Sequence, residues 1–245
     1  MKIIFKIHPI YYLVALIMII NGMFKDYVYV TILILIHEIG HVVTALKYNW
    51  KIKKVVILPF GGITIFNDFI NKSLKEEFLI LIMGPIFQII FYLILCCLNI
   101  TTPLITNYHY LLLLFNMLPI IPLDGSKFLN IILNKIISFK KSHMLTIYIS
   151  ILTILFLLLI LIKEKNLVFI FILSFLIIKV IKEIKEHKYI FNKFLFERYN
   201  YNLKFNKIKY INGIKLHKMK KEYRHFFYDK KYYTEKEVLK KHFKY

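Results

Sequence analysis

Long apolar runs, separated by short polar stretches, constrain this 245-residue chain more than any other feature of its sequence. Hydrophobic residues make up 58% of the chain and charged residues 20%, which excludes an ordinary water-soluble domain and a disordered chain. Runs of this length match the hydrocarbon core of a bilayer when they are helical. We therefore predict an all-α polytopic membrane protein with about six transmembrane helices, near residues 9–24, 27–46, 76–98, 108–137, 144–162 and 166–184.

The distribution of positive charge predicts the orientation of these helices. The formal net charge is +21, and lysines gather before the first span, after every second span and in the tail. Lysine and arginine mark the cytosolic side of a membrane protein, so we expect both termini in the cytosol. Nucleic-acid binding is another reading of a basic chain, but no nucleic-acid motif supports it, and we expect no nucleic-acid partner. The basic tail is interpreted as a surface beside anionic lipid headgroups.

A β-hairpin is predicted within residues 47–75, between the second and third spans. The stretch KIKKVVILPFGGITIF has β-branched runs on both sides of Pro59, Gly61 and Gly62, which is typical of two strands joined at a glycine turn. Its apolar content indicates a membrane-associated hairpin. An amphipathic loop lying in the membrane interface explains the same pattern equally well.

The sequence HEIGH lies inside the second predicted span and contains residue types that can bind a metal ion and act in catalysis. On a helix His37 and His41 share one face, so both imidazoles can bind one metal ion. Glu38 lies beside them, where a carboxylate can act as a general base. Ionisable side chains in the middle of a span are costly unless they are paired or liganded. A hydrogen-bonded polar cluster between helices is the alternative to a zinc site.

A third zinc ligand is expected at Asp124. Pro119 and Pro122 interrupt the fourth span, and Asp124 follows this break, so that an irregular turn can direct its carboxylate into the bundle. A catalytic zinc site needs three protein ligands and one open position. The alternative role for Asp124 is an N-cap of the helix that begins at Gly125.

These motifs, with Gly84–Pro85 in the third span and NMLPIIPLDG in the fourth, resemble the site-2 protease family of intramembrane zinc metalloproteases, peptidase family M50. The resemblance implies zinc (Zn2+) as cofactor, with His37, His41 and Asp124 as ligands and Glu38 as the catalytic base. The function it implies is hydrolysis of a peptide bond near the cytosolic face of the membrane.

Further short motifs look like the branch of this family that works in sporulation. They are KIHP near the start, LPFGG, LKEEF and FLFERY. This branch implies a sigma-factor precursor of the pro-sigma-K type as substrate, regulatory membrane proteins as partners, and a place in the membrane around the forespore. A homo-oligomer is an open option.

The substrate must unwind before it is cut, because a helix hides its carbonyls in internal hydrogen bonds. Extended segments at Phe60, Gly61, Gly62 and Pro122 are expected to hold it by strand-like edges. Asn116 matches a polar family position near the bound substrate. An asparagine within a span is equally suited to joining two helices.

Two domains are predicted, a six-span protease domain at 1–187 and a small basic cytosolic α+β tail at 188–245. The tail reads as strand, helix, strand and a closing helix, with Thr234 and Glu237 as a capping box. It faintly resembles a shortened half of a cystathionine-β-synthase (CBS) type domain. So small a core makes ATP a doubtful ligand.

Histidines outside the motifs are expected at the membrane interface or in solvent rather than as ligands: His8, His109, His143, His187, His217, His225 and His242. The adjacent Cys96 and Cys97 are expected to be inert and unpaired with each other, because neighbours on a helix point in different directions.

Two other functions are also compatible with the sequence. One is a site-2 protease of another branch that cleaves a membrane anti-sigma factor, although such proteins commonly carry an inserted PDZ domain and no predicted connection here is long enough for one. The other is a non-enzymatic membrane scaffold or transporter with a structural metal. A transporter should show repeated spans, and no convincing repeat is present.

Overall fold

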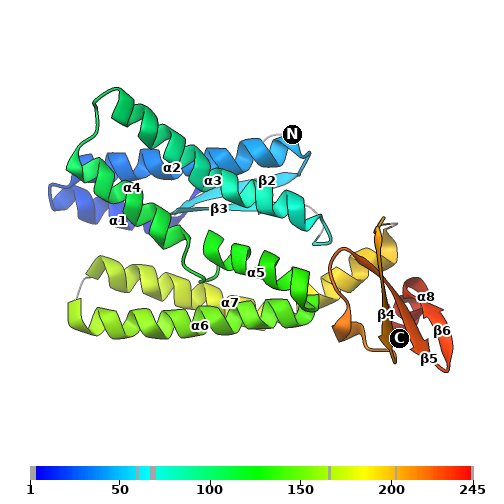
Figure 1. The fold of residues 1–245 in the computed structure, drawn as a ribbon. Coiled ribbons are helices and arrows are strands. Elements are labelled where there is room, and N and C mark those ends of the chain that lie inside the picture. Colours follow the sequence, from blue (N-terminus) through cyan, green and yellow to red (C-terminus); the bar gives the residue numbers. More distant parts are fainter. Residues whose placement is uncertain (1–3, 59–60, 67–69, 165–166, 202, 244–245) are drawn as a thin grey trace.

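The computed structural model describes residues 4–58, 61–66, 70–164, 167–201 and 203–243. Figure 1 shows two groups of helices with a short helix between them and a small unit beyond one end. The elements up to the last long helix are β1 (Ile4–Ile7), α1 (Pro9–Ile20), α2 (Phe24–Lys47), β2 (Ile52–Leu58), β3 (Gly61–Phe66), α3 (Leu74–Cys97), α4 (Pro103–Asn116), α5 (Asp124–Ile136), α6 (Phe139–Glu164) and α7 (Leu167–Asn200).

Three helices of the described chain are long and apolar enough to cross a membrane: α2, α3 and the part of α6 from Phe139 to Ile160. Helix α1 is apolar but shorter. The full set of six spans therefore stays a prediction. The fourth predicted span is broken as expected, since α4 ends at Asn116 and α5 begins at Asp124.

A three-stranded sheet lies against α2. Strands β2 and β3 are antiparallel, with Ile57 opposite Gly62 and Leu58 opposite Gly61, as the predicted hairpin requires. A third strand that was not predicted, β1, pairs parallel with β2. Four residues directly before an apolar run are too few to show a strand period. Pro59 and Phe60 lie outside the described residues, and the position of the sheet relative to the membrane stays a prediction.

Helices α2 and α3 pack very closely, because a glycine faces the backbone of the neighbouring helix. A Cβ atom on Gly40 would overlap with the carbonyl group of Met83. Small residues at a crossing allow two helix backbones to approach. This contact places the side of α2 that carries His37 and His41 directly against α3.

The second group of helices is built on α6 and α7, whose apolar side chains form the largest buried cluster. The segment between α4 and α5 packs on this cluster through its own apolar residues, of which Ile120 is fully buried. The backbone N–H of Ile121 donates to Ser150 Oγ, and Ser150 Oγ donates to the carbonyl of Pro119. The break before Asp124 is therefore fixed by contacts with α6.

The C-terminal unit contains a second three-stranded sheet. Its elements are β4 (Lys207–Asn212), a 3-10 turn (Leu216–Lys218), β5 (Tyr223–Asp229), β6 (Lys231–Thr234) and α8 (Glu235–Phe243). Strand β4 pairs parallel and β6 antiparallel with β5. The predicted order of strand, helix, strand and closing helix is found in part, since the first helix is only a 3-10 turn and an extra strand, β6, precedes α8. The capping box is confirmed: the N–H of Thr234 donates to Glu237 Oε2 at 2.8 Å and the N–H of Glu237 to Thr234 Oγ1 at 3.4 Å.

The unit packs on the end of α7 and the start of α6 through an apolar cluster that includes Phe139, Phe194, Met219 and Phe227. Helix α7 runs without interruption to Asn200, across the expected boundary between residues 187 and 188. The division into two domains stays a prediction.

Candidate metal centre

Two imidazoles and one carboxylate from separate helices meet in the interior. His37 Nε2 lies 3.0 Å and His41 Nε2 lies 2.9 Å from Asp124 Oδ2, and the two nitrogens are 3.1 Å apart. All three residues are buried. His37 and His41 lie one turn apart on α2, and Asp124 is the first residue of α5. The structure thus brings together the three residues expected to bind zinc.

Hydrogen bonds on the far side of each imidazole fix which nitrogen carries a proton. His41 Nδ1 lies 2.8 Å from the carbonyl of Ile80, which only accepts, so Nδ1 is the protonated nitrogen. Gln88 Nε2 donates to the carbonyl of His109 at 3.1 Å, which turns Gln88 Oε1 toward His37 Nδ1 at 3.0 Å. His37 therefore donates from Nδ1. Both Nε2 atoms carry lone pairs that point at each other and at Asp124.

Three potential ligand atoms this close together can share one cation. Ligands at the usual zinc distances lie about 3.3 Å from each other in a tetrahedron, close to the separations found here. Two neutral imidazoles and one carboxylate are a common ligand set for catalytic zinc. Gly84 keeps the space beside them open, because a Cβ there would overlap with His41 Nε2 and lie 2.8 Å from His37 Nε2. The residues present fit a zinc ion.

Glu38 lies next to these ligands and is also buried. One ligand atom each of His37, Glu38 and His41 lies within 4.8 Å of the others, so two overlapping sets of three are available. Asp124 Oδ2 contacts both imidazole nitrogens, whereas Glu38 Oε2 accepts a hydrogen bond from Thr64 Oγ1 at 2.9 Å, so the geometry favours Asp124 over Glu38 as the expected third ligand. Glu38 contacts neither imidazole nitrogen among these hydrogen bonds, as expected of a base rather than a ligand.

The capping role considered for Asp124 does not match the structure. The N-cap of α5 is Leu123, which makes no side-chain capping bond, and Asp124 is already inside the helix. Its second oxygen, Oδ1, accepts from Lys127 Nζ at 2.8 Å. The carboxylate is thus shared between the imidazoles on one side and an ammonium group on the other.

Of the residues expected to hold substrate, Gly62 lies against Glu38 and Gly61 against Asn116, and Phe60 lies outside the described residues. A Cβ on Gly62 would overlap with the Glu38 carboxyl group, and a Cβ on Gly61 would lie 2.9 Å from Asn116 Oδ1. Asn116 is buried at the end of α4. The structure therefore brings the start of β3 next to both the expected base and Asn116.

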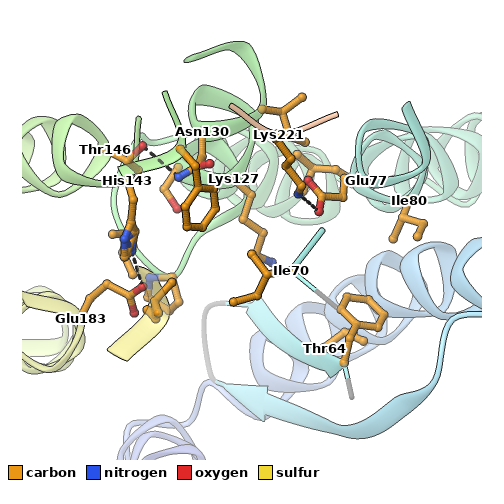
Figure 2. Close-up of a pocket in the computed structure, with 18 of the residues that line it drawn as sticks. Thr64, Ile70, Glu77, Ile80, Lys127, Asn130, His143, Thr146, Glu183 and Lys221 are labelled. Carbon is orange, nitrogen blue, oxygen red and sulfur yellow. Dashed lines mark hydrogen bonds and ion pairs between the residues drawn. The ribbon is translucent and has the colours of Figure 1, made fainter. Parts of the chain in front are cut away.

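A cavity of about 430 Å³ adjoins this centre. His41 of α2 and Thr64 of β3 line it. Lys221 of the C-terminal unit lines it together with Glu77 of α3 (Figure 2). Pro122 also lines the cavity. Figure 2 shows Asn130 bonded to Thr146, His143 to Glu183 and Lys221 to Glu77 around its rim. The cavity is thus walled by elements from both groups of helices and from the C-terminal unit.

Three residues that contact the centre were not predicted from the sequence, namely Thr64, Gln88 and Lys127. Each has a signal in its spacing. Gln88 follows Gly84 by four residues on a helix and Lys127 follows Asp124 by three, so each shares a face with its neighbour. Thr64 follows Gly62 by two residues on a strand and shares its face. These signals become informative only once the facing element is known.

The expectation that the remaining histidines are interfacial or solvated was wrong for His109, His143 and His225, which are all buried. His109 stacks on Tyr92 with ring centroids 4.2 Å apart. His143 Nε2 lies 2.9 Å from Glu183 Oε1. A histidine on a helix or strand is buried when another element covers it, and the sequence does not show which element does.

Comparison with known proteins identifies the family. Residues 27–110, which include the HEIGH motif, match the family model of peptidase family M50. The chain is 33% identical over 204 residues to stage IV sporulation protein FB of Bacillus subtilis (strain 168). The aligned region covers 79% of this chain and 70% of that protein. The chain belongs to peptidase family M50. The resemblance inferred from its motifs is confirmed at the level of this family of proteases.

Other M50 and site-2 protease matches agree. Zinc metalloprotease MJ0392 of Methanocaldococcus jannaschii is 35% identical over 120 residues, which is 44% of this chain and 34% of that protein. The solved structure of a site-2 protease from the same organism superposes with a TM-score of 0.60 at 26% identity, covering 75% of this chain and 93% of that one. This M50 protein therefore has the site-2 protease fold and is a membrane protein.

Proposed function

We propose that this protein is a zinc-dependent intramembrane protease that cuts a protein substrate near the cytosolic membrane face. The observation that carries the proposal is the set of two imidazole nitrogens and one carboxylate oxygen, each within 3.1 Å of the others, with the Nδ1 atom of each imidazole bonded to another acceptor. The names of the relatives, a zinc metalloprotease and a site-2 protease, support the same reading.

The residues divide into ligands and a base. His37, His41 and Asp124 would hold the ion. Zinc held there supplies a Lewis acid for the scissile carbonyl and makes a nearby water more acidic. Glu38 accepts the proton of the attacking water at its carboxylate and passes it to the amine that leaves. The buried position of all four side chains excludes bulk water, which strengthens their electrostatic interactions.

The substrate is proposed to bind as an extended strand. Within the described residues β3 pairs with β2 on one side only, so its other edge is available for a further strand. Gly61 and Gly62 have no side chains, which permits a peptide backbone to approach Glu38 and Asn116. Pro122, on the cavity wall, is proposed to contact the same peptide.

The proposed substrate is a sporulation sigma-factor precursor of the pro-sigma-K type. The relative named for stage IV of sporulation supports this choice, as does its coverage of most of the chain. The proposal includes regulatory membrane proteins as partners, both termini in the cytosol and a place in the membrane around the forespore. The lysines on alternate connections support the orientation.

Glu38→Gln tests the proposed function. The full chain is co-expressed with a pro-sigma-K type precursor, with a membrane anti-sigma factor as a second substrate, and cleavage is read by immunoblot. The wild type should cleave the sigma-factor precursor. Glu38→Gln should reduce cleavage by at least about 10²–10⁴-fold, because the base is lost, while zinc content stays unchanged.

Glu186→Gln is the matched control, since Glu186 lies on α7 and pairs with Lys182. It should cleave like the wild type. Cleavage by Glu38→Gln would contradict the assigned base. Cleavage of the anti-sigma factor alone would assign the protein to another branch of the site-2 proteases. A zinc-loaded protein that cleaves neither of the two substrates would support the scaffold alternative.

A further inference from the structure

We propose that Thr64 positions the catalytic base by holding one oxygen of its carboxylate. This inference rests on the proposed function, because it concerns how Glu38 acts within it. Thr64 lies in β3 and is buried, and its hydroxyl donates to Glu38 Oε2 at 2.9 Å. Glu38 Oε1 is left as the oxygen that receives the proton of the attacking water.

Glu38 needs such a contact because its side chain has several rotatable bonds. A general base must lie within hydrogen-bond reach of the water it deprotonates, and a displacement of about 1 Å can cost about 10²-fold in rate. The ligands His37 and His41 are each fixed through Nδ1, by Gln88 and by the carbonyl of Ile80. Thr64 provides the corresponding contact for the base.

The backbone of β3 restricts the same carboxylate from a second direction. Gly62 lies two residues before Thr64 and therefore faces the same side of the strand. A Cβ atom on Gly62 would overlap with Glu38 Cγ and Cδ and lie 2.6 Å from Oε1. The carboxyl group thus lies against the strand backbone at Gly62 while Thr64 holds its Oε2 atom. Two positions on one strand face define one orientation of the base.

Thr64 also lines the cavity beside the metal centre, as Figure 2 shows. A peptide that binds along the edge of β3 would therefore contact the strand that positions Glu38. Binding of substrate and orientation of the base are linked through one element. A purely structural threonine would satisfy its buried hydroxyl and contribute nothing more.

The test uses Thr64→Val, which keeps the shape of the side chain and removes the hydroxyl, and Thr64→Ser, which restores it. The full chain is assayed in detergent with the substrate cleaved in the co-expression experiment. Thr64→Val should lower kcat by about 10- to 100-fold, leave KM within about threefold and keep full zinc content. Thr64→Ser should recover most of the rate.

Thr44→Val is the control, because Thr44 is a buried threonine of α2 whose hydroxyl donates only to the carbonyl of Gly40 among its described contacts. Its kcat should match the wild type. A wild-type kcat in Thr64→Val would overturn the inference. Loss of zinc in Thr64→Val, or a higher KM with an unchanged kcat, would also overturn it. If Thr64→Val does not accumulate, Thr64→Ala takes its place.

A readout without substrate separates this inference from the proposed function. Melting temperatures are measured for Thr64→Val, Glu38→Ala and the double variant. The shift in melting temperature of the double variant should be smaller than the sum of the shifts of the two single variants, since each substitution removes the same hydrogen bond. Additive shifts would overturn the inference even in a protein that cleaves substrate. A wild type that cuts nothing, with coupled shifts, would overturn the function and retain the contact.

Discussion

At the scale of single residues, protonation is decided by neighbours that do not touch the proposed ion. The carbonyl groups of Ile80 and His109 are acceptors only, and they determine the tautomer of His41 directly and that of His37 through Gln88. A metal-binding histidine usually donates its other N–H in this way, which orients the ring and raises its basicity. The sequence motif identifies the two imidazoles, and these contacts leave the Nε2 atom of each ring as the one that could bind an ion.

Removing the carboxylate ligand should release the metal. Asp124→Asn replaces an anionic oxygen by a neutral amide and leaves the ammonium group of Lys127 without its ion pair. We expect zinc content per chain to fall by about tenfold or more, since carboxylate and imidazole ligands both contribute to affinity. Metal analysis of purified protein measures the change. Asp229→Asn in the C-terminal unit is the control, and unchanged metal in Asp124→Asn would contradict the ligand assignment.

Gln88 should matter for metal affinity although it contacts no ion. Gln88→Leu removes the acceptor for His37 Nδ1–H, so His37 loses its fixed tautomer and orientation. We expect zinc affinity to fall by about 10- to 100-fold, measured by competition with a chelator. Tyr92→Phe removes a hydroxyl on the same helix that bonds to Thr106, and should bind zinc normally. Equal affinities of Gln88→Leu and the wild type would show that His37 is held by other contacts.

At the scale of elements, the site depends on a close crossing of α2 and α3 and on the break between α4 and α5. The crossing brings Gly84 against the imidazoles, and the break turns Asp124 toward them. Strand β3 covers the remaining side through Gly62 and Thr64. Each element contributes either a glycine, whose backbone lies against the site, or one polar side chain that contacts it.

Gly40→Ala tests the crossing. Alanine favours a helix over glycine by about 1 kcal/mol, so the substitution would stabilise an isolated α2. In the protein its Cβ overlaps with the carbonyl of Met83, which belongs to the backbone and cannot move aside easily. We expect the free energy of unfolding to fall by about 1–3 kcal/mol, with a lower melting temperature in detergent.

Val43→Ala, on an exposed side of α2, is the control for the crossing and should change the free energy of unfolding by about 0.5 kcal/mol or less. A Gly40→Ala protein that melts at a higher temperature than the wild type would show that helix propensity outweighs the overlap. The crossing would then be looser than the contact with Met83 indicates.

At the scale of the whole molecule, the C-terminal unit is fixed to the start of α3. Glu222 Oε1 accepts from the N–H of Leu74 at 2.8 Å, and Lys221 pairs with Glu77 at the cavity rim. Just before α3, the side chain of Asn71 bonds to Glu197 and Arg198 near the end of α7. Segments more than a hundred residues apart in sequence therefore meet beside the cavity.

The C-terminal unit should weaken in mild acid because of His225. His225 Nε2 accepts from the N–H of Lys220 at 2.9 Å and Nδ1 lies 3.1 Å from Glu235 Oε2, so the folded unit needs a neutral imidazole. Burial, with the nearby charges of Arg198 and Lys209, lowers the pKa of His225 below its ordinary value of 6.5, against the opposing effect of Glu235. The unfolded chain then binds more protons than the folded one, so stability falls as the pH drops below 6.5.

Glu235 extends this loss to lower pH. Burial raises its pKa, but hydrogen bonds with His225 and the charge of Arg198 outweigh burial and hold the pKa below 4.5, so its contribution is lost below that value. Hydrogen exchange of the full chain, expressed as protection factors for 219–229 at about pH 7.5 and about pH 5.5, measures the effect. Protection should fall in the wild type and in the exposed control His217→Gln, and the response should be absent in His225→Gln. Equal protection of the wild type at both pH values would contradict the prediction.

The sequence by itself determined the family, the ligands His37 and His41 as candidates, and the helix break before Asp124. These depend on local spacing along one helix and on prolines that interrupt backbone hydrogen bonding, so no distant contact is needed to recognise them. The capping box at Thr234 was predictable for the same reason.

Only the tertiary structure decided which residues surround the centre. Gln88, Thr64 and the first strand, β1, have their roles through partners dozens of residues away, and short elements carry too little periodicity to reveal such pairings. Which helix faces are covered by a neighbour, and therefore that His109 is buried, is determined by the packing of the helices and not by hydropathy along the sequence. A local pattern supplies side chains of the right chemistry, and the packing of helices and strands brings their reactive atoms within bonding distance.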